Sequence, residues 1–126
     1  MDYLQFVARI EDLPFVEDRA TAEAALKAVL GILASKLGEE DAERLARSLP
    51  SPLDLEGLRG RQERPVPLSA SESVEVVRRQ FDLDGDQAHD LVFEVYRAVR
   101  ETLEQSTFAE IHARLPQDWA RLLDEA

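Results

Sequence analysis

AEAALKAVLGILASKLG (residues 22–38) and AHDLVFEVYRAVRETLE (residues 88–104) are two versions of one apolar segment, and together they decide the fold. Residue 88 corresponds to residue 22, so the offset is 66 positions, and the match continues on both sides, with a one-residue shift at the first short helix. An internal repeat of this kind fixes the building unit, here a helical unit of about 60 residues. Identical residues coincide at Phe15 and Phe81, Ala22 and Ala88, Val29 and Val95, Leu37 and Leu103, and the Leu-Pro pairs at 49–50 and 115–116.

Apolar residues recur in both copies at intervals of three and four, which is the spacing of one helix face. This spacing predicts long helices over about 20–37 and 86–105, each between shorter helices. No segment shows the sustained period-two alternation of a strand, so we expect no sheet. The predicted fold is all-α, with two tandem helical repeats packed as one pseudo-two-fold bundle. The predicted divisions are a first repeat at 1–58, a linker at 59–68 and a second repeat at 69–126, all within one compact domain.

Local signals suggest where individual helices begin and end. Gly38 is expected to end the first long helix as a C-cap, where a left-handed residue costs little. Ser69 with Glu72, and Thr107 with Glu110, have the spacing of capping boxes, which open helices. Leu49-Pro50 is expected to stop the short helix at about 40–48, and Pro116 to begin the last helix.

The composition limits the classes of function. The 126 residues carry a net charge of −11, with 26 acidic and 15 basic side chains, and no cysteine. Disulfides, thiolate chemistry and cysteine-based zinc sites are therefore excluded. An acidic surface repels nucleic acid and attracts basic partners. No apolar run reaches the roughly 18 residues of a membrane span, and the N-terminus lacks the pattern of a signal peptide, so we expect a soluble cytoplasmic protein.

The acidic stretch Asp82-Leu83-Asp84-Gly85-Asp86 is the sharpest local motif. Acids at Asp82, Asp84 and Asp86 resemble the start of a calcium-binding EF-hand loop, but Gln87 stands where that loop needs glycine. Phe93 stands where it needs a bidentate glutamate. The other interpretation is a turn followed by a helix N-terminus, where acidic residues complement the helix dipole.

Catalytic and metal-binding patterns are missing from the sequence. His89 and His112 are the only histidines, and neither has the Glu-x-x-His spacing of a di-metal bundle. The chain has no nucleophile elbow and no glycine-rich phosphate loop. We therefore expect no catalysis and no cofactor.

Two groups of residues are candidates for binding a partner. Phe93, Tyr96 and Trp119 widen the apolar faces of their helices, and they either complete the core or form an exposed patch. The linker holds the one basic island of the chain, which either binds an anion or acidic partner or pairs with the protein's own acids: Arg59, Arg61 and Arg64.

Several of these motifs also resemble those of a known family. The Met1-Asp2-Tyr3 opening, the Leu37-Gly38 helix end, the Glu39-Glu40-Asp41-Ala42 step and the Leu49-Pro50 stop are similar to one unit of the bacterial domain of unknown function 2267. The second unit resembles the family's ending at residues 115–123, whereas Pro52 and Leu53 replace the acidic–aromatic pair in the first unit. The resemblance implies a small, all-helical protein and brings no catalytic residues.

These observations lead to one leading hypothesis and two others. The leading hypothesis is an adaptor or regulator that acts through contact with an unknown protein partner or through self-association, without nucleic acid or membrane. The alternative is a protein that binds a metal or a small molecule with the acidic loop at 82–86. A weaker third is an acidic mimic of nucleic acid that captures basic DNA-binding proteins.

Overall fold

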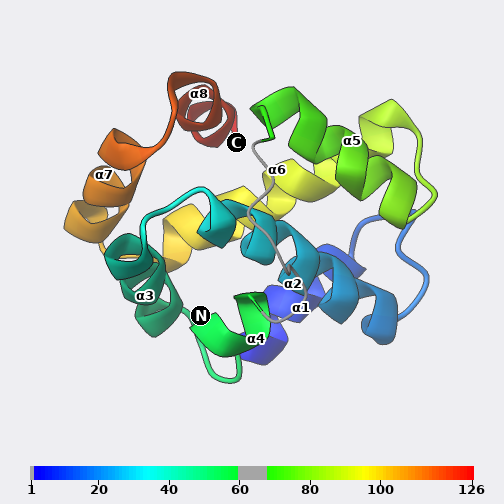
Figure 1. Cartoon of the computed structure of the whole chain (residues 1–126). Coiled ribbons are helices and arrows are strands. Elements are labelled where there is room, and N and C mark those ends of the chain that lie inside the picture. The colour runs from blue at the N-terminus through cyan, green and yellow to red at the C-terminus, as the bar shows by residue number, and fades with distance from the viewer. Residues whose placement is uncertain (1, 60–67) are drawn as a thin grey trace.

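The computed structural model describes residues 2–59 and 68–126, and all regular secondary structure in these ranges is α-helical (Figure 1). The all-α prediction is therefore confirmed for the described part of the chain. The helices there are α1 (Tyr3–Glu11), α2 (Arg19–Ser35), α3 (Glu39–Ser48), α4 (Leu55–Arg59), α5 (Ala70–Gln80), α6 (Gly85–Thr102), α7 (Gln105–Arg114) and α8 (Gln117–Glu125).

The two long helices lie at the centre of the molecule, and the shorter helices surround them (Figure 1). Helix α2 contacts α6 directly, while α1 packs on both α2 and α6, and α5 packs on both α6 and α2. Helices α3 and α7 lie side by side, α4 covers α2, and α8 covers α6 and α5. No helix in the described ranges is both long enough and apolar enough to cross a membrane.

The helix ends fall at corresponding positions of the two repeats. Asp18 caps the N-terminus of α2 and Asp84 that of α6, each through a side-chain oxygen that accepts a backbone N–H three residues on. Leu49 and Leu115 are the C-caps of α3 and α7. The capping box expected at Ser69 is confirmed. The offset of 66 residues therefore holds for the structure at these helix ends as well as for the sequence.

Two predicted helix ends are wrong. Gly38 is not left-handed (φ −61°, ψ 162°), because α2 already ends at Ser35 and the N–H groups of Lys36 and Leu37 close its last turn. Gly38 instead precedes α3 as its N-cap, and its carbonyl accepts the N–H of Ala42. Thr107 does not cap α7, which begins earlier, at Gln105.

The core is one continuous cluster built from both repeats. Leu33 of α2 and Val99 of α6 are each 1% exposed, as the central position of these helices requires. The pseudo-two-fold axis stays a prediction, and one contact supports it. Arg44 of α3 forms an ion pair with Glu110 of α7, and these residues occupy the same position in the two repeats. Equivalent residues meet each other where a two-fold axis passes between them.

The two tyrosines are held in their neutral form. The hydroxyl of Tyr3 on α1 donates a hydrogen bond of 2.8 Å to Glu23 on α2. Burial, and then the hydrogen bond and charge of Glu23, raise the pKa of Tyr3 to about 12. Burial also raises the pKa of Tyr96. Both residues therefore favour the folded state wherever the phenol is neutral.

Truncation of a central side chain tests the core assignment. We expect Leu33→Ala to lower the free energy of unfolding by about 2–5 kcal/mol, since the change removes buried methyl groups and leaves a cavity. The control is Val76→Ala on α5, where the side chain is 38% exposed, and the change should stay within about 0.5 kcal/mol. Urea denaturation measures both values, and equal effects would contradict the central position of α2.

The raised tyrosine pKa values predict a loss of stability in alkali. The unfolded chain ionises its tyrosines near pH 10, whereas the folded chain resists ionisation, so stability is full below about pH 10 and falls as pH rises through the folded values. Tyr3→Phe should reduce this decline, as measured by urea denaturation at a series of pH values. Ionisation of both tyrosines near pH 10 in the folded protein, followed by tyrosinate absorbance, is the contrary result.

Candidate functional site

The acidic loop at 82–86 is a junction between two helices. Asp82 is left-handed (φ 52°) and directly follows the C-cap of α5. The N–H of Leu83 bonds the carbonyl of Arg78 at 2.9 Å, and the N–H of Asp82 bonds that of Arg79 at 3.4 Å. These two bonds define a Schellman motif, which ends α5. Asp82 thus occupies a position where glycine is usual.

The other acids of this loop begin the next helix. The Asp84 side chain accepts the N–H of Gln87 at 2.8 Å, and the Gln87 side chain accepts the N–H of Asp84 at 3.1 Å. Asp86 lies in the first turn of α6, where it complements the helix dipole. No group of three or more metal-ligating side chains occurs among the described residues. The loop therefore has the geometry of the turn and helix start that the sequence offered as the alternative to a cation site.

The aromatic candidates for partner binding lie mainly inside the molecule. Tyr96 is 1% exposed and Trp119 is fully buried, with its indole N–H donating to the carbonyl of Leu68 at 3.2 Å. The possibility that these two rings form an exposed patch is thus wrong, because both lie in the hydrophobic core. Phe93 is half-buried, and its ring stacks at a tilt on His89, with 3.9 Å between the ring centroids.

The remaining candidates are the linker arginines and His112. The backbone of Arg59 ends α4, whereas Arg61 and Arg64 lie outside the described residues. His112 lies on the half-buried face of α7, and its Nε2 is 3.0 Å from Asp124 Oδ1 on α8. The imidazole and the carboxylate thus lie next to each other between α7 and α8, but Nε2 makes no hydrogen bond in the described part of the chain.

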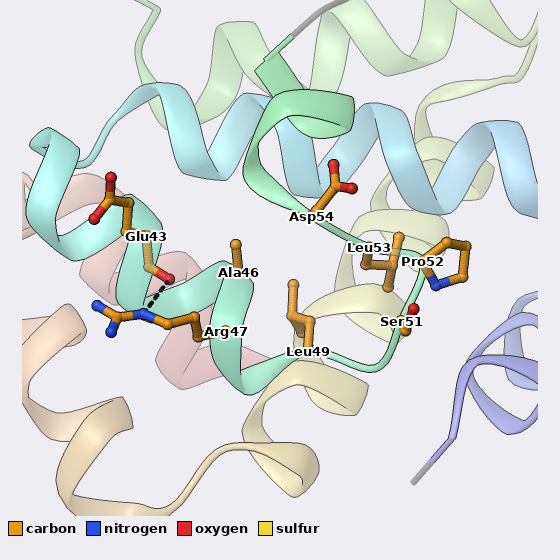
Figure 2. A pocket seen from close by; sticks show the side chains of 8 residues that line it. All are labelled: Glu43, Ala46, Arg47, Leu49, Ser51, Pro52, Leu53 and Asp54. Carbon is orange, nitrogen blue, oxygen red and sulfur yellow. Dashed lines mark hydrogen bonds between the residues drawn. The ribbon is translucent and has the colours of Figure 1, made fainter.

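A groove of about 490 Å³ opens beside α3, and it was not predicted from the sequence (Figure 2). Figure 2 shows one wall on α3 and the other on the segment that leads from α3 to α4. Its floor is apolar, since Ala46, Leu49 and Leu53 are at least nine-tenths buried. The residues that line it are Glu43, Ala46, Arg47, Leu49, Ser51, Pro52, Leu53 and Asp54.

The groove exists because the two repeats differ in side-chain volume at this place. Ala46 and Leu53 in the first repeat correspond to His112 and Trp119 in the second. In the second repeat α8 follows the Leu-Pro step at once and runs for nine residues, whereas α4 has only five. The first repeat thus carries smaller side chains and a shorter closing helix, which leaves room for the groove beside α3.

The charged side chains at the groove make few hydrogen bonds or ion pairs with the described part of the protein. Asp54 Oδ1 accepts the N–H of Gly57 at 2.7 Å and so caps α4. Among the described residues, Arg47 bonds only to the carbonyl of Glu43 on its own helix, at 3.5 Å. The Glu43 carboxylate has no cationic partner among the described residues. The groove therefore offers an apolar floor between two acids and one cation.

One sequence signal pointed to this place. Pro52 and Leu53 depart from the acidic–aromatic pair that the second repeat has at the same positions. The departure marks a structural difference between the repeats, but a groove follows only when the neighbouring volumes are known.

Substitutions in the acidic loop separate its structural role from cation binding. We expect Asp82→Gly to raise the free energy of unfolding by about 0.5–1 kcal/mol, because glycine tolerates the left-handed conformation. Asp84→Ala removes the N-cap of α6 and should lower it by about 1 kcal/mol. Chemical denaturation gives both values, and neither should change with millimolar Ca²⁺. A higher melting temperature of the unmodified protein in Ca²⁺ would instead establish a cation site.

Comparison with known proteins gives one family. The family model described as "Uncharacterized conserved protein (DUF2267)" matches residues 3–122, which include both repeats. No curated protein matches the chain. The match confirms the resemblance stated from the motifs of the sequence.

Proposed function

The chain belongs to the DUF2267 family of uncharacterized conserved proteins, and from its own surface we propose that it is an adaptor or regulator that binds a partner protein without catalysis. The observation that carries this proposal is the groove beside α3. We take its occupant to be a short segment of the partner, with one large apolar side chain seated on the floor. The proposal keeps the protein in the cytoplasm, with no nucleic acid and no membrane among its partners.

The size and the lining of the groove support an apolar anchor. A volume of about 490 Å³ lies within the usual range of ligand pockets, about 300–1,000 Å³. Ala46, Leu49 and Leu53 present carbon to any side chain that enters. Burying one leucine or phenylalanine side chain there is worth about 1.5–3 kcal/mol. A single anchor of this kind gives weak binding, which suits an adaptor that must also release its partner.

The charge of the protein favours a basic segment. Glu43 and Asp54 stand at the groove with one cation, Arg47, and the whole chain has a net charge of −11. A lysine or arginine next to the apolar anchor meets the carboxylate of Glu43, which has no cationic partner among the described residues. The net charge also accelerates the approach of a basic partner at low salt.

Filling the groove with the side chains of the other repeat tests this proposal. The double variant Ala46→His/Leu53→Trp places the residues of the second repeat at the corresponding positions of the first. Random 12-residue peptides displayed on phage, selected on the unmodified protein, should yield sequences that combine an apolar residue with lysine or arginine. Their affinity, measured by fluorescence anisotropy, should fall about tenfold or more in the filled variant, as loss of one buried anchor requires.

The matched control is Ala113→His, which adds the same side chain to an exposed position of α7. It should leave the affinity of the selected peptides unchanged, and circular dichroism should show that both variants stay folded. Two results contradict the proposal. One is that no peptide is enriched on the unmodified protein, and the other is that the filled variant binds the enriched peptides equally well.

A further inference from the structure

A second hollow, of about 410 Å³, lies between α5, α6 and α8, away from the groove. We propose that it binds a small zwitterion with the chemistry of a free α-amino acid. The carboxylate of this ligand faces Arg121 and its ammonium group faces Glu125. A short apolar side chain then lies against Val74 and Leu122. This inference is independent of the partner-binding function proposed above.

The hollow has the same kind of origin as the groove, but in the other repeat. Helix α5 corresponds to α1 at an offset of 67 residues, since the buried Ser73 and Val77 occupy the places of Phe6 and Ile10. At this offset Ala70 stands where the first repeat has Tyr3.

The partner of Tyr3 also differs between the repeats. In the first repeat Tyr3 hydrogen-bonds Glu23 and fills the space between α1 and α2. In the second repeat Ala70 and His89 occupy these two positions, and both line the hollow. The exchange of a tyrosine for an alanine removes a ring from this place and leaves the hollow.

Two opposite charges on α8 face the hollow without being used elsewhere. Arg121 and Glu125 lie four residues apart, on one face of the helix. Neither makes a hydrogen bond or an ion pair within the described ranges. Acids outnumber bases by 26 to 15 in the chain, and most described arginines bond to a carboxylate or a carbonyl. Arg9, Arg78 and Arg114, for comparison, each form an ion pair.

The charges also limit the chemical class of the ligand. Asp118 lines the hollow, and its Oδ2 accepts the N–H of Ala70 at 2.8 Å. A simple anion such as phosphate is repelled by Asp118 and Glu125, although Arg121 attracts it. A simple amine is attracted by the two acids but leaves Arg121 without a partner. A zwitterion satisfies both signs at once, and the apolar surface of Val74 and Leu122 takes its side chain.

L-leucine is the first probe, because it joins an ammonium group, a carboxylate and a short apolar side chain. We expect millimolar L-leucine to shift backbone amide signals of α5, α8 and the first turns of α6 in heteronuclear NMR spectra, and to do so saturably. 3-Methylbutyrate and 3-methylbutylamine each carry only one of the two charges. At equal concentration they should give much smaller shifts, and an equal response to either compound overturns the zwitterion assignment.

Substitutions then locate the site. Arg121→Gln and Glu125→Gln should each weaken L-leucine binding about tenfold, since each removes one charge-assisted contact. Both residues are exposed on α8, so the fold is retained. The control is Arg97→Gln on α6, outside the hollow, which should bind as the unmodified protein does. Unchanged affinity in both α8 variants, or no shift in the unmodified protein, overturns the proposal.

A variant in which larger side chains fill the hollow provides a further test. Ala70→Tyr/His89→Glu introduces the pair that closes the equivalent space in the first repeat, and it should abolish the response to L-leucine. The groove variant Ala46→His/Leu53→Trp should keep the response in full. Loss of peptide binding and loss of leucine binding are thus separate results, and failure of one proposal leaves the other standing. L-leucine binding that survives in the Ala70→Tyr/His89→Glu variant places the ligand elsewhere and overturns the assignment.

Discussion

The contact between α2 and α6 is the constraint on which the rest of the structure depends. Each long helix is apolar over more of its surface than one repeat alone covers, and each buries that surface against helices of the other repeat. The short helices α1 and α5 reach across in the same way, since α1 packs on α6 and α5 packs on α2. Ion pairs such as Arg9 with Glu94 and Arg114 with Asp41 add links between the repeats at the edges of this core. The hydrophobic core is therefore shared by the two repeats.

In this duplicated structure the candidate binding sites lie where the two repeats differ. Positions that carry the same residue in both repeats, such as Val29 and Val95, are buried in the core and are not accessible to a ligand. Spaces open where one repeat has a large side chain and the other a small one. The groove beside α3 is lined by Leu53, where the second repeat has Trp119. The hollow beside α8 is lined by Ala70, where the first repeat has Tyr3. Each repeat thus has a smaller side chain at one position where the other repeat has a large aromatic ring.

The helices and the shared core could be predicted from the sequence, because both follow from apolar periodicity and from the repeat. The helix start within residues 82–86 was one of the two interpretations of the acidic stretch, since acidic residues there complement the helix dipole. Gly38 was assigned wrongly because a glycine after a helix resembles a C-cap, whereas here the chain had already left α2. Tyr96 and Trp119 remained ambiguous because periodicity places a residue on a face without saying what covers that face. The two hollows depend on volumes contributed by several helices, so periodicity does not predict them.

The basic side chains fall into two groups, those that bond within the fold and those that line a hollow. Most described arginines of this acidic chain are taken up by the fold, as Arg44 is by Glu110 and Arg100 is by the carbonyl of Ala126. Within the described ranges Lys27 and Arg121 make no hydrogen bond or ion pair, and Arg47 reaches only a carbonyl of its own helix. Each of these three lines a hollow, and the hollow at Lys27, of about 230 Å³, shares Pro52, Leu53 and Asp54 with the groove. Lys36, which lies over the Trp119 ring, and Arg100 also form no ion pair within the described ranges, but both contact other parts of the fold. Lys27, Arg47 and Arg121 make no polar contact with another helix there, and the two proposals assign a partner to Arg47 and a ligand to Arg121.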